Sequence, residues 1–161
     1  MEAQERLEVG HWESDSLLYP HGQALNVLVD RCSRFALVTK LEGRTAEATS
    51  TVLTQRLASR PVYSLTADNG SENYHHQRVS HALGIAFFFC HPYHSWEKGT
   101  VENMNGLIRR YLPRRTDLRH LPQEELDQIA DELNNRPRKC LHYQTPLEIL
   151  SLHPVALGTR I

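Results

Sequence analysis

One α/β domain, with a mixed five-stranded β-sheet flanked by helices, is the fold that this sequence predicts. The chain has 161 residues and is 40% hydrophobic, which suits one domain with a substantial core. Three strand-like segments joined by short turns open the sequence and indicate an antiparallel meander. Strand-like and helical segments then alternate, and parallel strands require crossovers between them. We therefore expect a single domain over residues 1–161.

The meander is predicted from three apolar segments separated by turn residues. The first strand is centred on Trp12 and ends before Pro20 and Gly22, which break the pattern. The second strand covers residues 24–30, and the third covers residues 35–41 after a polar turn.

The alternating half begins with a helix that Thr45 can cap, and Pro61 ends its helical spacing of apolar residues. A strand, a helix capped by Ser71 and a fifth strand follow, at residues 62–66, 71–84 and 85–89. Three more helices are predicted at residues 100–111, 122–134 and 145–150. In the first of these, about 100° per residue places Glu102 and Arg109 away from the apolar stripe.

Membrane and secreted proteins are excluded by simple patterns. No segment approaches the roughly 18 apolar residues that a membrane-spanning helix needs. The first residues are too charged for a secretory signal. We therefore expect a cytoplasmic protein that has no membrane partner.

Cysteines and histidines raise the question of disulfides and zinc. Cys32, Cys90 and Cys140 lie far apart, so we expect reduced and mostly buried thiols. Among ten histidines, His91 and His94 lie near Cys90. A structural zinc site needs four ligands, and no clear fourth ligand is present. The histidines are therefore interpreted as loop and surface residues.

The net charge of −1 and the pI of about 6.8 do not indicate a nucleic-acid-binding protein. Charge is nevertheless concentrated locally, because one stretch holds five arginines and a single acid, Asp117. The arginines are Arg109, Arg110, Arg114, Arg115 and Arg119. The cluster is either a solvated face or a surface that contacts phosphates, and we favour the second interpretation.

Three carboxylates are candidates for metal-dependent chemistry on a phosphodiester. Such reactions are helped by two divalent cations about 4 Å apart, and magnesium prefers oxygen ligands. Asp15 lies on the first strand, Asp68 follows the fourth strand, and Glu102 lies one turn into a helix. Because the ends of adjacent strands gather ligands in α/β sheets, the three can converge.

Six sequence blocks around these acids resemble the insertion sequence 30 family of bacterial transposases, over about residues 10–150. The blocks are Trp12-Glu-Ser-Asp15, Leu28-Val-Asp-Arg-Cys-Ser-Arg-Phe35, Asp68-Asn-Gly-Ser-Glu72, Ser95-Trp-Glu-Lys-Gly-Thr-Val-Glu-Asn103, Asn105-Gly-Leu-Ile-Arg109 and Leu133-Asn-Asn-Arg-Pro-Arg138. They occur in the family's order, with 33 residues between Asp68 and Glu102, which makes the match far more specific than one motif.

The resemblance implies an Asp-Asp-Glu recombinase with a ribonuclease H-like fold, which is shared with retroviral integrases. Asp15 and Asp68 would bridge two Mg²⁺ or Mn²⁺ ions, and Glu102 would complete their coordination. Water would attack at an element end to free a 3'-hydroxyl, which would then attack a second phosphodiester. The implied partners are DNA, as element ends and target, and further copies of the chain in a homodimer or higher oligomer.

Four residues near the acids are candidates for DNA contact. Lys98, Arg109 and Arg110 can bind phosphates. Trp96, like Tyr93, can either stack on a base or anchor its loop to the core.

This chain departs from the family pattern in three respects. Ala67 and Asn73 stand where family members usually have aromatic residues, so looser packing around the site is expected. The family's N-terminal helix-turn-helix region is expected to be absent, because the core begins almost at Met1. One alternative is therefore a truncated or domesticated core that binds DNA or a partner transposase without catalysis. Another is a nuclease of the same fold that only hydrolyses.

Overall fold

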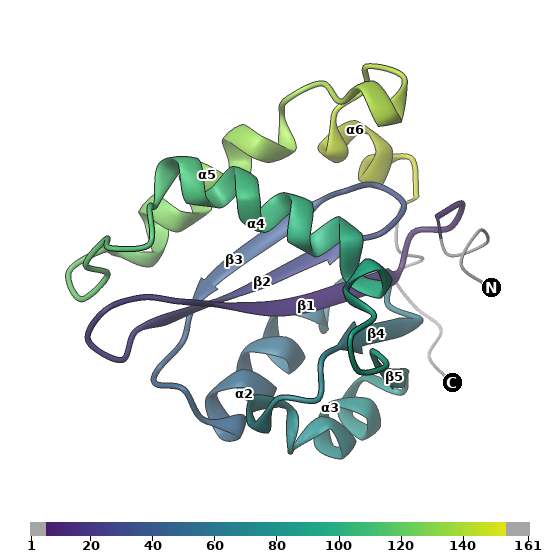
Figure 1. Ribbon diagram of the computed structural model, residues 1–161. Coiled ribbons are helices and arrows are strands. Elements are labelled where there is room, and N and C mark those ends of the chain that lie inside the picture. The colour runs from purple at the N-terminus through teal and green to yellow at the C-terminus, as the bar shows by residue number, and fades with distance from the viewer. Residues whose placement is uncertain (1–5, 154–161) are drawn as a thin grey trace.

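One five-stranded sheet, in the order β3-β2-β1-β4-β5, forms the centre of the computed structural model, which describes residues 6–153 (Figure 1). The strands are β1 (His11–Leu18), β2 (Ala24–Asp30), β3 (Ala36–Lys40), β4 (Ser64–Ala67) and β5 (Ala86–Phe89). β1, β2 and β3 pair antiparallel, whereas β4 pairs parallel with both β1 and β5. The predicted meander and the mixed five-stranded sheet are confirmed.

Helices cover both faces of this sheet (Figure 1). They are α2 (Ala46–Leu57), α3 (His76–Leu83), α4 (Gly99–Tyr111), α5 (Gln123–Asn134) and α6 (Pro146–Ser151), with 3₁₀ turns η1 (Ser71–Asn73), η2 (Ser95–Lys98) and η3 (Lys139–Leu141). Apolar residues of α4 and α5 pack on one face of β1, β2 and β3. Those of α2 and α3 pack on the other face, around the fully buried Trp12.

Helix capping follows the sequence in one helix and departs from it in another. Thr45 caps α2 as predicted, because its hydroxyl accepts a hydrogen bond from the Ala48 amide at 3.1 Å. The predicted helix from Ser71 is wrong, since η1 forms there and α3 begins only at His76. The reason is local competition: the Asn73 side chain bonds back to the turn at Asp68 instead of continuing a helix.

The free edge of β3 is closed by two amide side chains of α5. Asn134 accepts a hydrogen bond from the Ala36 amide at 2.8 Å and donates one to the Ala36 carbonyl at 2.9 Å. Gln123 likewise accepts from the Lys40 amide at 3.0 Å and donates to the Val38 carbonyl at 2.8 Å. The backbone groups that an edge strand leaves unpaired are thus satisfied by α5.

Substituting Asn134 by alanine is expected to lower the free energy of unfolding by about 2 to 6 kcal/mol. The substitution leaves a buried amide and a buried carbonyl of Ala36 without partners, at about 1 to 3 kcal/mol each. Urea unfolding followed by circular dichroism measures the change. Asn135→Ala is the matched control, because Asn135 is exposed. Equal effects of the two substitutions would show that the clamp contributes little.

All three cysteines are free, as expected, but their predicted burial is wrong for one of them. Cys90 is buried, Cys32 is half-buried and Cys140 is exposed. Cys140 lies in η3, a single turn at the surface between α5 and α6. Across residues 6–153, none of the helices has the length and apolar character needed to cross a membrane.

Candidate active site

Two adjacent parallel strands bring Asp15 and Asp68 to the same level of the sheet. The last aligned pair of β1 and β4 is Glu13 with Thr66. Asp15 lies two residues beyond Glu13, and Asp68 lies two residues beyond Thr66. Since side chains alternate with a period of two, this register places both carboxylates at neighbouring positions beyond the paired segment.

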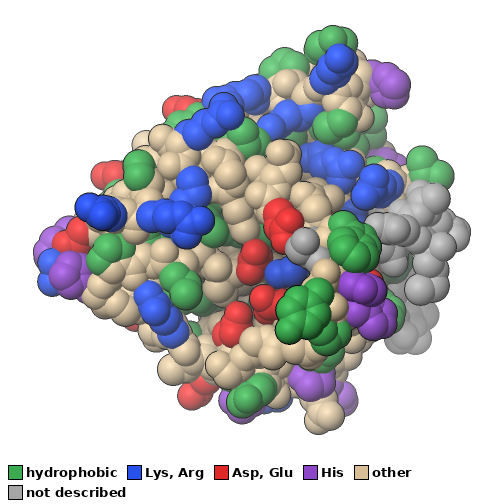
Figure 2. All heavy atoms as spheres, viewed as in Figure 1, with side chains coloured by type: hydrophobic (Ala, Val, Ile, Leu, Met, Phe, Trp, Pro, Cys, Tyr) green, Lys and Arg blue, Asp and Glu red, His purple; other side chains and the backbone are tan. Residues whose placement is uncertain are grey.

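The ammonium of Lys98 lies between these two aspartates. Its Nζ atom is 3.4 Å from Oδ1 of Asp15 and 3.6 Å from Oδ2 of Asp68. Because both oxygens contact the same ammonium, the two carboxylates lie close to each other. Burial lowers the pKa of Lys98, but the two aspartates raise it by more, and the net shift is upward. Lys98 therefore remains charged at neutral pH. Figure 2 shows acidic side chains grouped around one basic side chain on this face.

Two asparagines orient the aspartates. Asn105 of α4 donates a hydrogen bond to Oδ2 of Asp15 at 3.0 Å. Asn73 donates to the carbonyl of Asp68 at 2.9 Å and to its Oδ1 at 3.3 Å. Asn73 and Ala67 are both buried. The looser packing expected where family members have aromatic residues stays a prediction.

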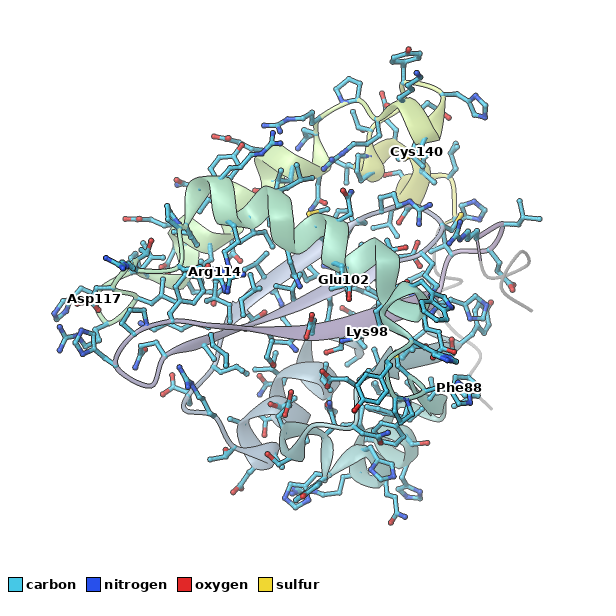
Figure 3. All side chains as sticks on the ribbon, in the orientation of Figure 1. Phe88, Lys98, Glu102, Arg114, Asp117 and Cys140 are labelled. Atoms are coloured by element: carbon cyan, nitrogen blue, oxygen red, sulfur yellow. The ribbon has the colours of Figure 1, made fainter. Side chains whose placement is uncertain are left out.

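Glu102 is exposed, as predicted, and lies on the strip of α4 that faces the aspartates. It is three residues before Asn105 and four after Lys98, and residues at these spacings are neighbours on a helix surface. Figure 3 shows Glu102 and Lys98 at the same end of α4. Within residues 6–153, no hydrogen bond or ion pair joins Glu102 to Asp15 or Asp68, and the three acids do not form a tight three-ligand group.

A buried ion pair fixes the start of α4. Arg31, just after β2, donates from Nε to Oε1 of Glu13 at 2.8 Å. The other oxygen of Glu13 accepts a hydrogen bond from the Val101 amide at 2.7 Å. Arg31 also donates to the carbonyl of Glu97 at 2.7 Å. Together these contacts join β1 and the end of β2 to η2, which carries Lys98, and to the first turn of α4, which carries Glu102.

A cleft of about 340 Å³ opens beside the two aspartates. Asp15 and Asp68 line it together with Ser71 and Arg44. The guanidinium of Arg44 donates to the carbonyl of Tyr19 at 2.7 Å. The side chains of Asp15 and Asp68 are 21% and 47% exposed, so both carboxylates are accessible to cations.

Comparison with known proteins identifies the family to which this chain belongs. Residues 6–95, more than half of the chain, match the family model described as "Integrase core domain". The chain belongs to the integrase core domain family.

Relatives of this integrase core domain include named transposases. It is 45% identical over 154 residues to the transposase for insertion sequence element IS1086 of Cupriavidus metallidurans, covering 93% of this chain and 45% of that protein. It is 40% identical over 148 residues to transposase InsI for insertion sequence element IS30A of Escherichia coli, covering 90% of this chain and 39% of the other. The chain thus spans less than half the length of these relatives, and the resemblance to the insertion sequence 30 family is confirmed.

Solved structures show the same fold. The catalytic core domain of BIV integrase aligns with a TM-score of 0.68 at 21% identity, covering 88% of this chain and 93% of that one. A chain in the simian T-cell lymphotropic virus intasome in complex with PP2A regulatory subunit B56 gamma aligns with a TM-score of 0.70 at 23% identity, covering 93% and 56%. The ribonuclease H-like fold is therefore confirmed.

Only some of the arginines that the sequence grouped together remain available in this integrase core domain. Arg119 is paired with Asp117 at 2.7 Å. Arg109 lies over the Tyr19 ring at 4.4 Å and donates to the carbonyl of Leu18 at 3.3 Å, so it contacts its own chain. Arg110, Arg114 and Arg115 are exposed, and Figure 3 labels Arg114 on the same face as Glu102.

Of the two remaining candidates for DNA contact, Trp96 is exposed and Lys98 is buried. Trp96 is 63% exposed and stacks on the ring of His94, with centroids 4.5 Å apart, so it does not anchor its loop to the core. Lys98 is buried against the aspartates, which differs from the expected position at a phosphate-binding surface.

Sequence reasoning missed several residues that shape the site. Asn73 and Asn105 hold the aspartates. Asn105 begins one of the six sequence blocks and lies three residues after Glu102, and these two signals could have indicated its role. The contact between the Glu97 carboxylate and Nδ1 of His91, at 2.9 Å, was not predicted.

Proposed function

We propose that this chain is the catalytic core of a DNA transposase, which holds divalent metal ions on Asp15, Asp68 and Glu102 and acts on DNA in the cytoplasm. One observation carries the proposal: two carboxylates from adjacent parallel strands converge on a single positive charge. An arrangement that attracts an ammonium also attracts a hard cation with oxygen ligands.

The donor set fits Mg²⁺ or Mn²⁺. Both ions take carboxylate oxygens and keep several waters, so a few acids in an open cleft suffice. Asp15 and Asp68 line such a cleft, and their side chains are 21% and 47% exposed. When bound, two such ions would activate the attacking oxygen and stabilise the leaving oxygen of the phosphodiester.

Other residues of the chain would orient the metal ligands or contact DNA. Asn105 and Asn73 each hold one oxygen of an aspartate, and the other oxygen of each aspartate is the one that contacts Lys98. Glu102 would reach the site from the helix surface that it shares with Asn105. Arg110 and Trp96, both exposed on neighbouring segments, would contact the DNA backbone and a base. The acting form is proposed to be a homodimer or higher oligomer that binds element ends and target.

Lys98 would compete with the metal ions for the two aspartates. Its ammonium lies within 4 Å of both carboxylates, where unit charges interact by about 1 kcal/mol or more even in water. We propose that metal binding displaces Lys98 from between the acids, where its ammonium would then be able to contact a phosphate.

Substituting Lys98 by methionine is expected to tighten Mn²⁺ binding by about tenfold, which corresponds to about 1.4 kcal/mol. The substitution keeps a long apolar side chain but removes the competing charge. Isothermal titration calorimetry measures the affinity, with Lys139→Met as the control because Lys139 is exposed far along the chain in η3. Unchanged or weaker Mn²⁺ binding in Lys98→Met would contradict the competition.

A strand-transfer assay tests the function itself. The chain is incubated with Mg²⁺ or Mn²⁺ and a pre-cleaved element end, and joining to target DNA is followed on a gel. Metal-dependent joining is expected. Hydrolysis without joining would favour a nuclease, and binding of DNA without either reaction would favour a catalytically silent core.

A further inference from the structure

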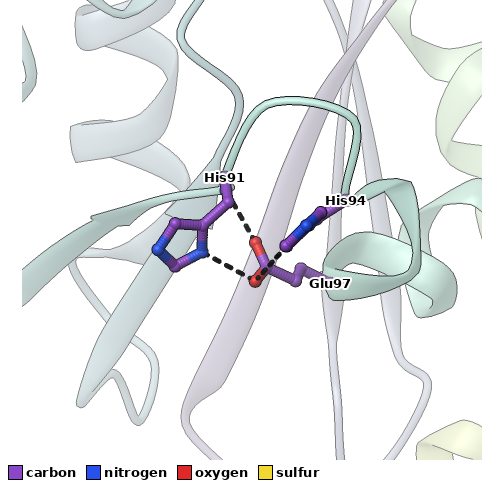
Figure 4. A group of neighbouring side chains, drawn as sticks. All are labelled: His91, His94 and Glu97. Carbon is purple, nitrogen blue, oxygen red and sulfur yellow. Dashed lines mark hydrogen bonds and ion pairs between the residues drawn. The ribbon is translucent and has the colours of Figure 1, made fainter.

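A second cluster of metal-ligand side chains lies in the loop between β5 and α4, outside the aspartate site. The cluster consists of His91, His94 and Glu97, which we call the loop triad (Figure 4). One potential ligand atom from each residue lies within 4.8 Å of the other two. In the part of the chain that the structure describes, this is the group of three whose ligand atoms come closest together.

Local backbone structure explains why the three side chains meet. His94 precedes η2 directly and Glu97 lies within it, and residues three apart eclipse each other on a 3₁₀ helix. His91 is brought back toward them by a turn, in which the His94 amide donates to the His91 carbonyl at 3.1 Å. Tyr93 adopts a left-handed conformation, with a φ of 62°, at this turn.

Glu97 is the centre of the loop triad. Its Oε1 atom lies 2.9 Å from Nδ1 of His91 and 3.6 Å from Nδ1 of His94. Its Oε2 atom accepts a hydrogen bond from the His91 amide at 2.7 Å, which fixes the carboxylate. Hydrogen bonds from the side chain and backbone of His91 lower the pKa of Glu97, so the carboxylate is charged at neutral pH.

Contacts outside the loop triad also orient it. The His94 ring stacks on Trp96 at an interplanar angle of 24°, which restricts the direction of its Nδ1 atom. The carbonyl of Glu97 is held by Arg31. Metal ligands are commonly oriented in this way by neighbouring groups.

We propose that the loop triad is a binding site for a transition-metal ion of the Zn²⁺ type, distinct from the carboxylate site for Mg²⁺ or Mn²⁺. Two imidazoles and one carboxylate are a zinc ligand set in sites that keep a further position open for water. Imidazole nitrogen suits zinc and its neighbours, whereas magnesium prefers oxygen. A three-ligand site needs no fourth protein ligand, which was the objection to a structural zinc site.

Exposure of the loop triad gives an ion a path of entry. The side chains of His91, His94 and Glu97 are 74%, 44% and 28% exposed. A bound ion would link His91, which lies two residues after β5, to η2, whose last residue is Lys98. Occupancy of this site would therefore stiffen the loop next to the two aspartates.

Titration with Zn²⁺ against a chromophoric zinc indicator tests the proposal on the whole chain. One zinc ion per chain is expected, and His94→Gln and Glu97→Gln are each expected to weaken binding at least about tenfold. His81→Gln is the matched control, because His81 is exposed on α3. Equal zinc affinity in wild type, His94→Gln and Glu97→Gln would overturn the proposal.

Two further measurements separate the loop triad from the aspartate site and from unfolding. The double variant Asp15→Asn/Asp68→Asn is expected to retain zinc binding, and loss of binding there would assign the ion to the aspartates instead. Co²⁺ added to the unmodified chain is expected to give visible absorption bands of nitrogen-ligated cobalt. A colourless cobalt complex would count against imidazole ligands without any variant being needed.

Discussion

Asp68→Asn is expected to slow metal-dependent strand transfer by about a thousandfold, which corresponds to about 4 kcal/mol of transition-state stabilisation. The amide has nearly the same shape as the carboxylate but cannot neutralise a divalent cation. Asn73 still finds the Asp68 carbonyl as an acceptor, so the turn after β4 is preserved. The rate is measured with a pre-cleaved element end in Mn²⁺, and Mn²⁺ affinity is measured by calorimetry.

Asp131→Asn is the matched control for this substitution, because Asp131 is exposed on α5. It should leave both the rate and the Mn²⁺ affinity unchanged. Wild-type rates in Asp68→Asn would remove Asp68 from the metal site. An equal loss in Asp131→Asn would show that the assay reports net charge and not ligation.

The second large effect is expected from the buried ion pair below α4. Glu13→Ala should lower the free energy of unfolding by about 3 to 5 kcal/mol, because it removes the buried carboxylate to which Arg31 donates from Nε. It also removes the acceptor for the Val101 amide at the start of α4. Urea unfolding measures the loss.

Two companion variants identify the cause of this loss. Glu13→Gln keeps a carbonyl acceptor but removes the charge, so it should lose less than the alanine variant. The double variant Glu13→Leu/Arg31→Met replaces the pair by apolar side chains and should recover much of the stability. If the double variant is as unstable as Glu13→Ala, the charge that Arg31 retains in Glu13→Ala is not the main cause of the loss.

The sheet could be predicted because its strands are separated by clear turn residues. β1 and β2 were bounded correctly at Leu18 and Ala24, since Pro20 and Gly22 leave no other interpretation. The meeting of Asp15 and Asp68 also followed, because Asp15 lies within β1 and Asp68 directly follows the end of the neighbouring β4. Amphipathic spacing likewise placed Glu102 on the exposed side of α4.

The contacts between the elements could not be predicted from local patterns. The sequence predicted Lys98 to be a surface cation that binds phosphates. In the structure it lies between two aspartates, a position that local sequence patterns do not indicate. Glu97 and His91 are six residues apart, and their contact depends on the turn at Pro92 and Tyr93. Pro92 indicates a turn, but no residue indicates that Tyr93 adopts a left-handed conformation. A left-handed tyrosine is rare, so sequence alone does not suggest it.

The amide side chains along β3 also restrict how copies of this domain can associate. Asn134 and Gln123 occupy the hydrogen-bonding groups to which a strand from another chain would add. Of the two outer strands of the sheet, this leaves β5, which has only four residues. Higher-order assembly is therefore expected to use helical or loop surfaces, and a continuous intermolecular sheet through β3 is blocked.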